Sequence, residues 1–318
     1  MPPATALRSA PPRPGPEPEP EASSQDPYPL GAVVDGRYAL RRILGRGGAA
    51  VVFAAENLRV RRPVALKLPL RDPDLGEILS ARLRRETDAL SRVRHPVIVD
   101  VVDAGESDGV PFLAMELLEG RTLSGLVAAR GRLAPAEVVK IGLEVAAGLS
   151  AVHAVGLVHR DVKPGNILIT RSPVNQVHLF DFGIARIGGA AEASDRKLTQ
   201  SGAILGTPEY MPMEALVSSP DADGRVDQYA LGVTLFECLT GSVPFEGQLG
   251  QILLKVATES APDLARLRPD VPPALVAVIA RCLAREPGDR FPNLDAVLEA
   301  LLAVATVAPS SLDLLRPV

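Results

Sequence analysis

The sequence predicts an α+β protein of two unequal lobes, in which a small strand-rich lobe precedes a larger helical one. Short β-branched or apolar runs separated by turn residues fill residues 37 to about 115. Helical periodicity dominates residues 121–303, with two short strand-like runs inside it. The chain of 318 residues is 47% apolar, so it is long and apolar enough for two lobes that share one site.

Composition argues against several classes of protein. The formal net charge is −4, whereas domains that bind nucleic acids are usually basic. The two cysteines, Cys238 and Cys282, are too few for a disulfide framework and fit a reducing compartment. No stretch has the length and apolarity of a signal peptide or a membrane span. We therefore expect a cytoplasmic protein with no nucleic-acid partner and no membrane span.

The chain divides into five parts. Residues 1–30 are rich in proline, alanine and glutamate, and they contain too little apolar surface to fold, so a disordered tail is expected there. The small lobe is expected over residues 31–115, a hinge over 116–120 and the large lobe over 121–303. Residues 304–318 are expected to form a C-terminal tail.

The small lobe is predicted to hold five strands and one helix. A helical pattern over residues 75–92 interrupts the strands. In the large lobe, short strands are expected at 167–169 and 177–180, and alternation places His178 on the exposed face of its strand. The strand-like runs of the small lobe are 38–44, 51–56, 64–68, 99–105 and 110–115.

A glycine-rich segment joins the first two of these strands. It fits G-x-G-x-x-[G/A], a pattern found in dinucleotide-binding turns as well as in loops that cover phosphates. A dinucleotide-binding turn opens a helix, whereas a β-branched run follows here, so a phosphate-covering hairpin is favoured over that turn. From the loop alone, an ordinary glycine-rich turn is an equal alternative. The loop consists of Gly45, Arg46, Gly47, Gly48, Ala49 and Ala50.

A lysine and a glutamate downstream of this loop are expected to form an ion pair. Ala65 and Lys67 share one face of the strand 64–68. On the following helix, Glu86 lies on the same stripe as the recurring leucines. A carboxylate on a core-facing stripe is costly unless it is paired, and Lys67, 19 residues upstream, is the expected partner.

The segment His159–Asn166 is the most specific in the chain. It matches H-R-D-x-x-x-x-N, in which the aspartate accepts the proton of a substrate hydroxyl and the asparagine holds a metal ion. The triplet Asp181-Phe182-Gly183 follows 15 residues after Asn166, behind an apolar strand. With these motifs in this order, residues 37–303 resemble the eukaryotic-like (Hanks-type) serine/threonine protein kinases, especially the bacterial branch.

The resemblance implies a bilobal protein-kinase fold that uses ATP and Mg²⁺, with Mn²⁺ as an alternative metal. In such a fold Lys67 would hold the α- and β-phosphates of ATP, and Glu86 would hold Lys67. The glycine-rich loop would cover the phosphates. Further ATP contacts are implied for Val52, Ala65, Glu116, Leu118 and Leu168.

The catalytic roles follow from the same resemblance. Asp161 would orient the acceptor hydroxyl, and Lys163 would neutralise the γ-phosphate. Asn166 and Asp181 would ligate Mg²⁺, a hard cation that prefers oxygen ligands. A lysine at position 163 is typical of kinases that phosphorylate serine and threonine, so protein substrates with Ser or Thr acceptors are implied.

The resemblance also implies an activation segment ahead of the peptide-receiving loop Gly206–Tyr210. We expect the kinase to phosphorylate itself there in trans, at Thr199 first and Ser201 second. Arg160 is placed to grip the added phosphate in bidentate fashion. Thr207 would instead bond the catalytic aspartate and lysine of the loop 159–166.

The resemblance implies two further contacts, and the sequence differs from the family's motifs at two places. Glu214 is expected to pair with Arg290, and Asp227 to anchor the backbone of the catalytic loop. The third glycine of the phosphate loop is Ala50, and the usual A-P-E triplet reads Pro212-Met213-Glu214. One methyl group is tolerable in the loop, and the altered triplet keeps its glutamate, so neither departure removes a charged group from the site.

Two other functions compete with this interpretation. A pseudokinase would use the same fold as a scaffold or binding module, but loss of Lys67, Asp161 or Asp181 would signal it, and all three are present. A small-molecule phosphotransferase with a similar fold is disfavoured by the peptide-receiving loop at 206–210.

Overall fold

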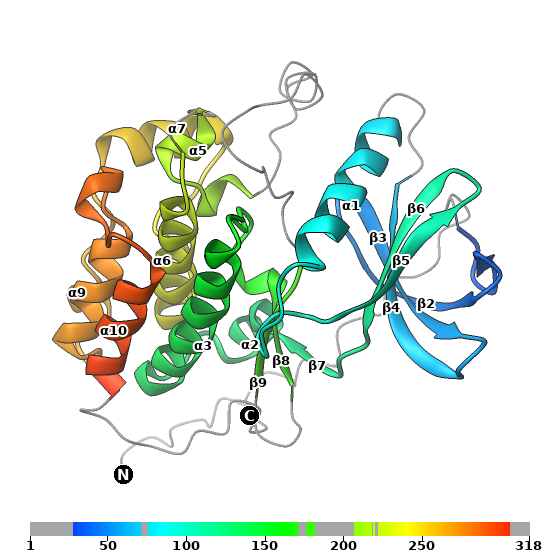
Figure 1. Ribbon diagram of the computed structural model, residues 1–318. Helices are drawn as coiled ribbons and strands as arrows, with labels where there is room; N and C mark the ends of the chain where they lie inside the picture. Colours follow the sequence, from blue (N-terminus) through cyan, green and yellow to red (C-terminus); the bar gives the residue numbers. More distant parts are fainter. Residues whose placement is uncertain are drawn as a thin grey trace, which may run out of the picture.

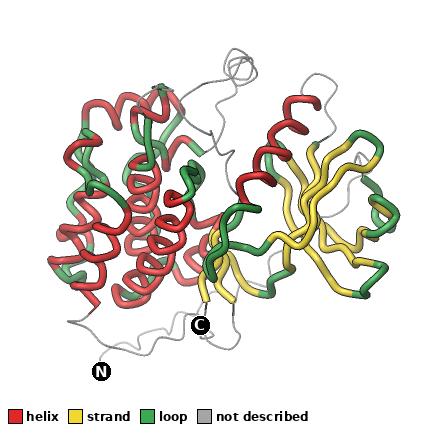
Figure 2. Tube along the Cα trace, in the orientation of Figure 1, coloured by secondary structure: helices red, strands yellow, loops and turns green. Residues whose placement is uncertain are grey.

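The protein folds into two lobes, one built mainly of strands and one mainly of helices (Figure 1). This computed structural model describes residues 28–70, 76–170, 176–181, 207–217, 219 and 222–305. Figure 2 shows that the strands gather in one lobe and the helices in the other, with a few short strands where the lobes meet. The α+β class expected from the sequence is therefore confirmed.

The small lobe is a six-stranded antiparallel sheet with the order β1-β2-β3-β4-β6-β5. Its helix α1 (Gly76–Leu90) contacts β4, β5 and β6. A separate core of buried side chains, which includes Phe53, Leu66 and Phe112, fills the inside of the sheet. The strands are β1 (Val33–Val34), β2 (Tyr38–Arg46), β3 (Ala50–Asn57), β4 (Arg62–Pro69), β5 (Val101–Ser107) and β6 (Val110–Glu116).

The packed part of the small lobe begins earlier than the sequence suggests. Tyr28, which the sequence placed in the tail, is buried, and its hydroxyl donates a hydrogen bond to the Pro69 carbonyl at 2.9 Å. Its ring meets Phe53 edge to face, with the centroids 6.3 Å apart. An aromatic side chain gains enough from such burial to hold a short stretch of chain in place. The structured chain therefore includes residues 28–30.

Strand β5 starts two residues later than expected, because the residues before it form hydrogen bonds with the large lobe. The amide of Leu179 donates to the Val97 carbonyl at 2.6 Å, and the amide of Val99 donates to the Leu179 carbonyl at 3.2 Å. Residues 97–99 therefore bond to the large lobe before the chain enters the sheet of the small lobe.

The large lobe is organised around α6 (Arg225–Thr240), whose residues are almost all buried. Helices α3, α9 and α10 pack against it, and both cysteines are buried and free in this core. None of the helices in the described ranges is both long and apolar enough to cross a membrane. The other helices are α2 (Leu123–Arg130), α3 (Pro135–Ala154), α5 (Met213–Leu216), α7 (Leu249–Thr258), α8 (Leu264–Leu267), α9 (Pro273–Cys282) and α10 (Leu294–Ala305).

A small sheet of β7 (Gly120–Thr122), β8 (Ile167–Thr170) and β9 (Gln176–Leu179) lies where the lobes meet. The prediction that His178 is exposed is wrong, because its side chain is only 7% exposed. Val177, His178 and Leu179 are all buried, so both faces of β9 are covered. Alternation predicts exposure only for a strand with one face in water.

Candidate active site

The ion pair predicted between Lys67 and Glu86 is present and buried. Lys67 lies on β4, and its Nζ is 2.7 Å and 2.6 Å from the two carboxylate oxygens of Glu86 on α1. The two residues are 7% and 4% exposed. Lys67 also contacts the carboxylate of Asp181, which follows β9 in the other lobe. One ammonium therefore connects the strand, the helix and the large lobe.

Burial and neighbouring charges shift the pKa values of Lys67 and Asp181 in opposite directions. Burial would lower the pKa of Lys67, but the carboxylates of Glu86 and Asp181 outweigh it, so the pKa is raised. The positive charge of Lys67 is the main cause of a lowered pKa at Asp181, and burial opposes it. Both groups are therefore fully charged at neutral pH.

The glycine-rich segment forms the turn of the hairpin between β2 and β3. The amide of Gly47 donates to the carbonyl of Ala50 at 2.9 Å. A helix does not follow, so the dinucleotide-binding alternative is excluded for this loop. A Cβ added to Gly45 or Gly48 would meet nothing within 4 Å, and one added to Gly47 would make an ordinary contact at 3.7 Å. Packing within the protein does not require these glycines, which fits a loop that a ligand approaches closely.

The predicted ATP contacts surround Lys67 or lie at the junction of the lobes. Val52 is the cross-strand partner of Lys67, and Ala65 lies two residues before it on the same strand. The backbone of Leu118 has no hydrogen bond to any described residue, so its amide and carbonyl are available to a ligand. The carboxylate of Glu116, in contrast, accepts the Asp100 amide at 3.1 Å and is turned toward β5.

The predicted catalytic residues converge in the large lobe. Lys163 Nζ is 2.9 Å and 2.8 Å from the carboxylate oxygens of Asp161, and it donates to Thr207 Oγ1 at 2.8 Å. Asn166 Nδ2 donates to the carbonyl of Asp161 at 2.8 Å and to its Oδ2 at 2.7 Å. Of the two contacts expected for Thr207, the structure has the one with Lys163. The side chain of Asp161 is thus held from two directions.

The donor set suits Mg²⁺. With its amide nitrogen committed to Asp161, the Oδ1 of Asn166 remains as an oxygen donor, and Asp181 contributes a carboxylate. Over the described ranges, no group of three or more His, Cys, Asp or Glu could hold a metal ion on its own. Mg²⁺ typically takes one or two protein oxygens and completes its shell with water and substrate phosphates.

Asp227 holds the backbone that carries Asp161. Its Oδ2 accepts the amide of His159 at 2.8 Å, and its Oδ1 accepts the amide of Arg160 at 2.7 Å. His153 Nε2 lies 2.8 Å from Oδ2. Burial would raise the pKa of this carboxylate, but the hydrogen bond with His153 and the backbone amide bond lower it, so Asp227 is ionised. Arg160 has a φ of +65°, a strained conformation for a non-glycine residue, and these bonds help to hold it.

Comparison with known proteins identifies the family. The protein kinase domain family matches residues 38–301. The chain belongs to this family. It is 43% identical over 258 residues to serine/threonine-protein kinase PknD of Mycobacterium tuberculosis, which covers 80% of this chain and 38% of PknD. With PknE of the same species it shares 39% identity over 273 residues, 85% of this chain and 47% of PknE.

A solved structure gives the same result. The crystal structure of the M. tuberculosis PknI kinase domain matches with a TM-score of 0.66 and 30% identity, covering 86% of this chain and 98% of that one. The bilobal protein-kinase fold is therefore shown. The chain spans less than half the length of the curated relatives PknD and PknE.

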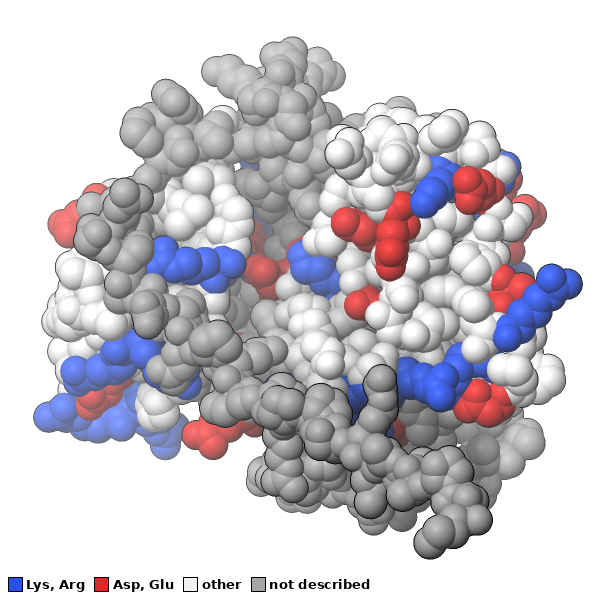
Figure 3. All heavy atoms as spheres, turned by 180° about the vertical axis from the view of Figure 1, so that it is seen from behind, with Lys and Arg blue, Asp and Glu red and all other residues white. Residues whose placement is uncertain are grey.

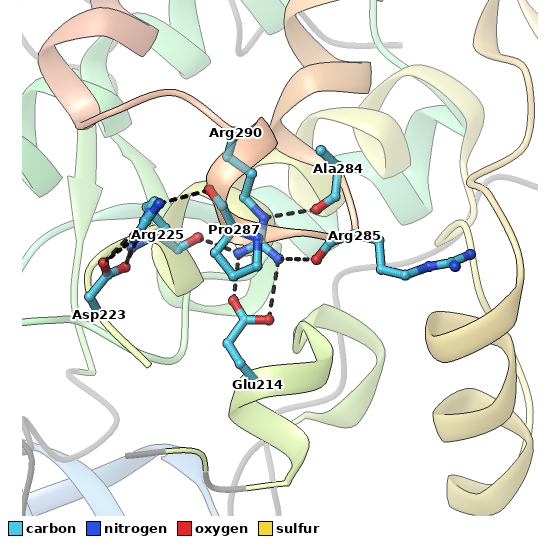
Figure 4. A network of polar contacts seen from close by, with 7 residues as sticks. All are labelled: Glu214, Asp223, Arg225, Ala284, Arg285, Pro287 and Arg290. Atoms are coloured by element: carbon cyan, nitrogen blue, oxygen red, sulfur yellow. Dashed lines mark hydrogen bonds and ion pairs between the residues drawn. The ribbon is translucent and has the colours of Figure 1, made fainter. Parts of the chain in front are cut away.

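The kinase domain also contains the ion pair expected between Glu214 and Arg290, at 2.6 Å (Figure 4). Arg290 donates to the carbonyls of Ala284, Arg225 and Arg285 at 2.9, 3.0 and 3.1 Å. All five of its N–H groups are used, since the terminal nitrogens make two bonds to Glu214. The missing proline of the usual A-P-E triplet therefore does not prevent this contact.

Sequence reasoning missed one residue of this site. Gly224 precedes α6, and a Cβ there would lie 2.5 Å from the ring of His153. Glycine thus leaves the space through which His153 reaches Asp227. No local signal indicates this, because residues 153 and 224 meet only in the folded kinase domain. Four predicted positions, Phe182, Gly183, Thr199 and Ser201, lie outside the described residues, as does Gly206 of the peptide-receiving loop.

Proposed function

We propose that this kinase domain transfers the γ-phosphate of ATP to serine or threonine hydroxyls of proteins. One observation carries the proposal: Lys67 of the small lobe contacts Asp181 of the large lobe while it is held by Glu86. The charges that would align a nucleotide are therefore assembled across both lobes at once. Phosphoryl transfer depends mainly on such positioning and on neutralisation of charge.

The small lobe would bind and align the nucleotide. Lys67 uses its three N–H donors on two oxygens of Glu86 and one of Asp181, so a phosphate oxygen would take the place of Asp181 while Glu86 keeps the ammonium in position. Gly45, Gly47 and Gly48 leave room for the phosphates above it. When bound through Asn166 and Asp181, Mg²⁺ would neutralise phosphate charge and orient the transferred group.

The large lobe would bind the acceptor. Asp161 is positioned by Asn166 and Lys163, and its carboxylate would accept the proton of the acceptor hydroxyl as the oxygen attacks phosphorus. Lys163 would neutralise charge on the transferred phosphoryl group. Thr207, bonded to Lys163, would place the peptide-receiving loop beside these two residues. The naming of PknD and PknE as serine/threonine-protein kinases supports Ser and Thr as acceptors.

We also propose activation by autophosphorylation in trans, with Thr199 as the first acceptor and Ser201 as the second. Both residues precede the loop of Thr207 in the sequence, and Arg160 directly precedes Asp161. A phosphate adds about −1.5 to −2 charges, which an arginine binds well. On the basis of the sequence we also propose a cytoplasmic location, a small lobe that ends at residue 115, a hinge at 116–120 and a large lobe over 121–303. The buried free cysteines fit a reducing compartment.

A scaffold or pseudokinase role is the alternative, and no observation favours it. Such a protein is expected to lack one of the charged groups, whereas Lys67, Asp161 and Asp181 are all present, and Lys67 contacts Glu86 as expected.

An Asp161→Asn variant tests the proposed function. With labelled ATP and a generic basic protein, its transfer rate at saturating ATP is expected to fall by roughly 10²–10⁴-fold. Exposed Asp263→Asn, on the surface near α8, is the matched control and should retain the wild-type rate. Nucleotide binding, measured by calorimetry, should survive in Asp161→Asn. A wild-type protein that binds ATP but transfers no phosphate under these conditions would favour the pseudokinase.

A further inference from the structure

The turn between β3 and β4 carries an excess of positive charge. Arg59, Arg61 and Arg62 are exposed around Val60, and exposed Arg41 of β2 joins them. We call these four arginines the arginine tip. Seen from behind, Lys and Arg side chains gather at this end of the small lobe (Figure 3).

The acidic partners of the arginine tip are few. Glu56 contacts both Arg41 and Arg61. Within the part of the chain that the structure describes, neither Arg59 nor Arg62 forms an ion pair. Like charges held close together repel, and an anionic partner lowers that energy. The arginine tip is therefore suited to an acidic segment.

The turn is also held in a fixed shape. Asn57 Oδ1 accepts the amides of Arg59 at 3.0 Å and Val60 at 3.4 Å, and the amide of Leu58 donates to the Arg37 carbonyl at 2.7 Å. A surface that is already ordered loses little entropy when it binds a partner.

The chain itself contains a segment of the opposite charge. Glu17, Glu19, Glu21 and Asp26 lie in a stretch with no lysine or arginine between Arg13 and Arg37. Proline alternates with glutamate over residues 16–21, and such sequences favour an extended conformation with little entropy to lose. These residues lie outside the described part of the chain.

The reach of this segment fits the distance. Tyr28 is bonded to Pro69 at one end of β4, and Arg62 lies at the other end, seven residues away. At about 3.3 Å per residue, that strand is about 23 Å long. Glu21 lies seven residues before Tyr28, which corresponds to about 22 Å of extended chain. We propose that residues 17–21 bind the arginine tip of the same molecule and hold this segment against the small lobe.

Disulfide trapping tests this contact without changing a charge. Pro18→Cys, ten residues before Tyr28 and so within reach, is combined with Val60→Cys, whose native side chain is 61% exposed. The two native cysteines are buried and do not compete. Mild oxidation should form an intrachain disulfide, visible as a shifted monomer on a non-reducing gel. The matched control pairs Pro18→Cys with Val102→Cys, which is also exposed on the small lobe but stands beside acidic Asp103 and Glu106.

The effect of charge and salt on the cross-linking rate distinguishes binding of the acidic segment from chance contact between two cysteines of one chain. Glu17→Gln, Glu19→Gln and Glu21→Gln together should slow the cross-link to Val60→Cys about tenfold, since three exposed ion pairs are lost. Salt at 1 M, where the Debye length is about 3 Å, should slow it similarly. Equal rates for the two cysteine pairs, rates insensitive to charge and salt, or a disulfide that forms only between two molecules would each overturn the proposal. Melting curves of all variants should match, because every substituted position named here is exposed or precedes Tyr28.

Discussion

Two buried ion pairs, one involving each lobe, use the same kinds of charge in different ways. Arg290 bonds one carboxylate and three backbone carbonyls, so all its N–H groups are satisfied within the helical lobe. Lys67 contacts two carboxylates, those of Glu86 and Asp181, and these come from different parts of the protein. Both cations use all their N–H donors, but every partner of Arg290 lies in the helical lobe, whereas Asp181 reaches Lys67 from the opposite lobe. The contact with Asp181 is the one that a phosphate would replace, so we expect the first pair to matter for stability and the second for activity.

Removal of Arg290 should give the largest loss of stability. Arg290→Ala leaves Glu214 and three carbonyls without their donor, so the free energy of unfolding should fall by about 3–5 kcal/mol. Urea denaturation followed by circular dichroism measures this. Arg266→Ala, in an exposed pair with Asp263, is the control and should change stability by about 0.5 kcal/mol at most. Similar losses in both variants would mean that the network contributes no more than a surface contact.

Removal of Lys67 should affect activity more than stability. Lys67→Met keeps most of the side-chain volume, but the alignment of the phosphates is lost. The transfer rate is expected to fall by roughly 10²–10³-fold, as for loss of one preorganised donor. Asp181→Asn should also be slow, but its rate should respond to Mg²⁺ concentration while that of Lys67→Met should not. An equal response to Mg²⁺ in steady-state assays would contradict the separate roles.

A double-mutant cycle should show that Glu214 and Arg290 act as a unit. Glu214→Ala and Arg290→Ala together should cost less than the sum of the single changes, with a coupling energy of about 0.5–3 kcal/mol. The coupling arises because the second substitution removes a charge that the first left unpaired. Strictly additive unfolding energies would show that the contact at 2.6 Å contributes little.

The smallest expected effect is a pH dependence that comes from His178. Burial is the main cause that lowers the pKa of His178, while the charges of Glu116 and Asp100 oppose it. The unfolded chain therefore binds a proton at a higher pH than the folded one, so stability is full above about pH 6.5 and falls as the pH drops. His178→Gln should lose less stability than the wild type between pH 7 and 5, as measured by thermal melts. Parallel pH profiles would show that His178 is not protonated in this range.

Local sequence patterns were enough to predict much of the candidate site. The hairpin at Gly45–Ala50 and the loop His159–Asn166 are contiguous, so their residue types indicate their chemistry directly. The Lys67–Glu86 contact was also predictable, because a carboxylate on an apolar stripe requires a partner. Glu214 and Arg290 could be paired only through the resemblance to a family, since nothing local connects them.

Other features depended on contacts that no local pattern encodes. Tyr28 looked like part of a proline-rich tail, but Phe53 and Pro69 provide a place for its ring and hydroxyl. His178 follows a pattern of alternation, yet both faces of its strand are covered because the two lobes meet there. Gly224 carries no motif, and its role follows only from the position of the His153 ring.

The sequence by itself determined the two-lobe α+β class, the order of the motifs and the chemical groups of the site, because periodicity and contiguous motifs are local properties of the chain. Only the tertiary structure revealed the contacts that no pattern or resemblance had indicated. The contact of Lys67 with Asp181 joins residues 114 positions apart, and that of His153 with Asp227 joins residues 74 positions apart. Such pairings depend on how the helices and sheets pack, and packing is a property of the whole fold.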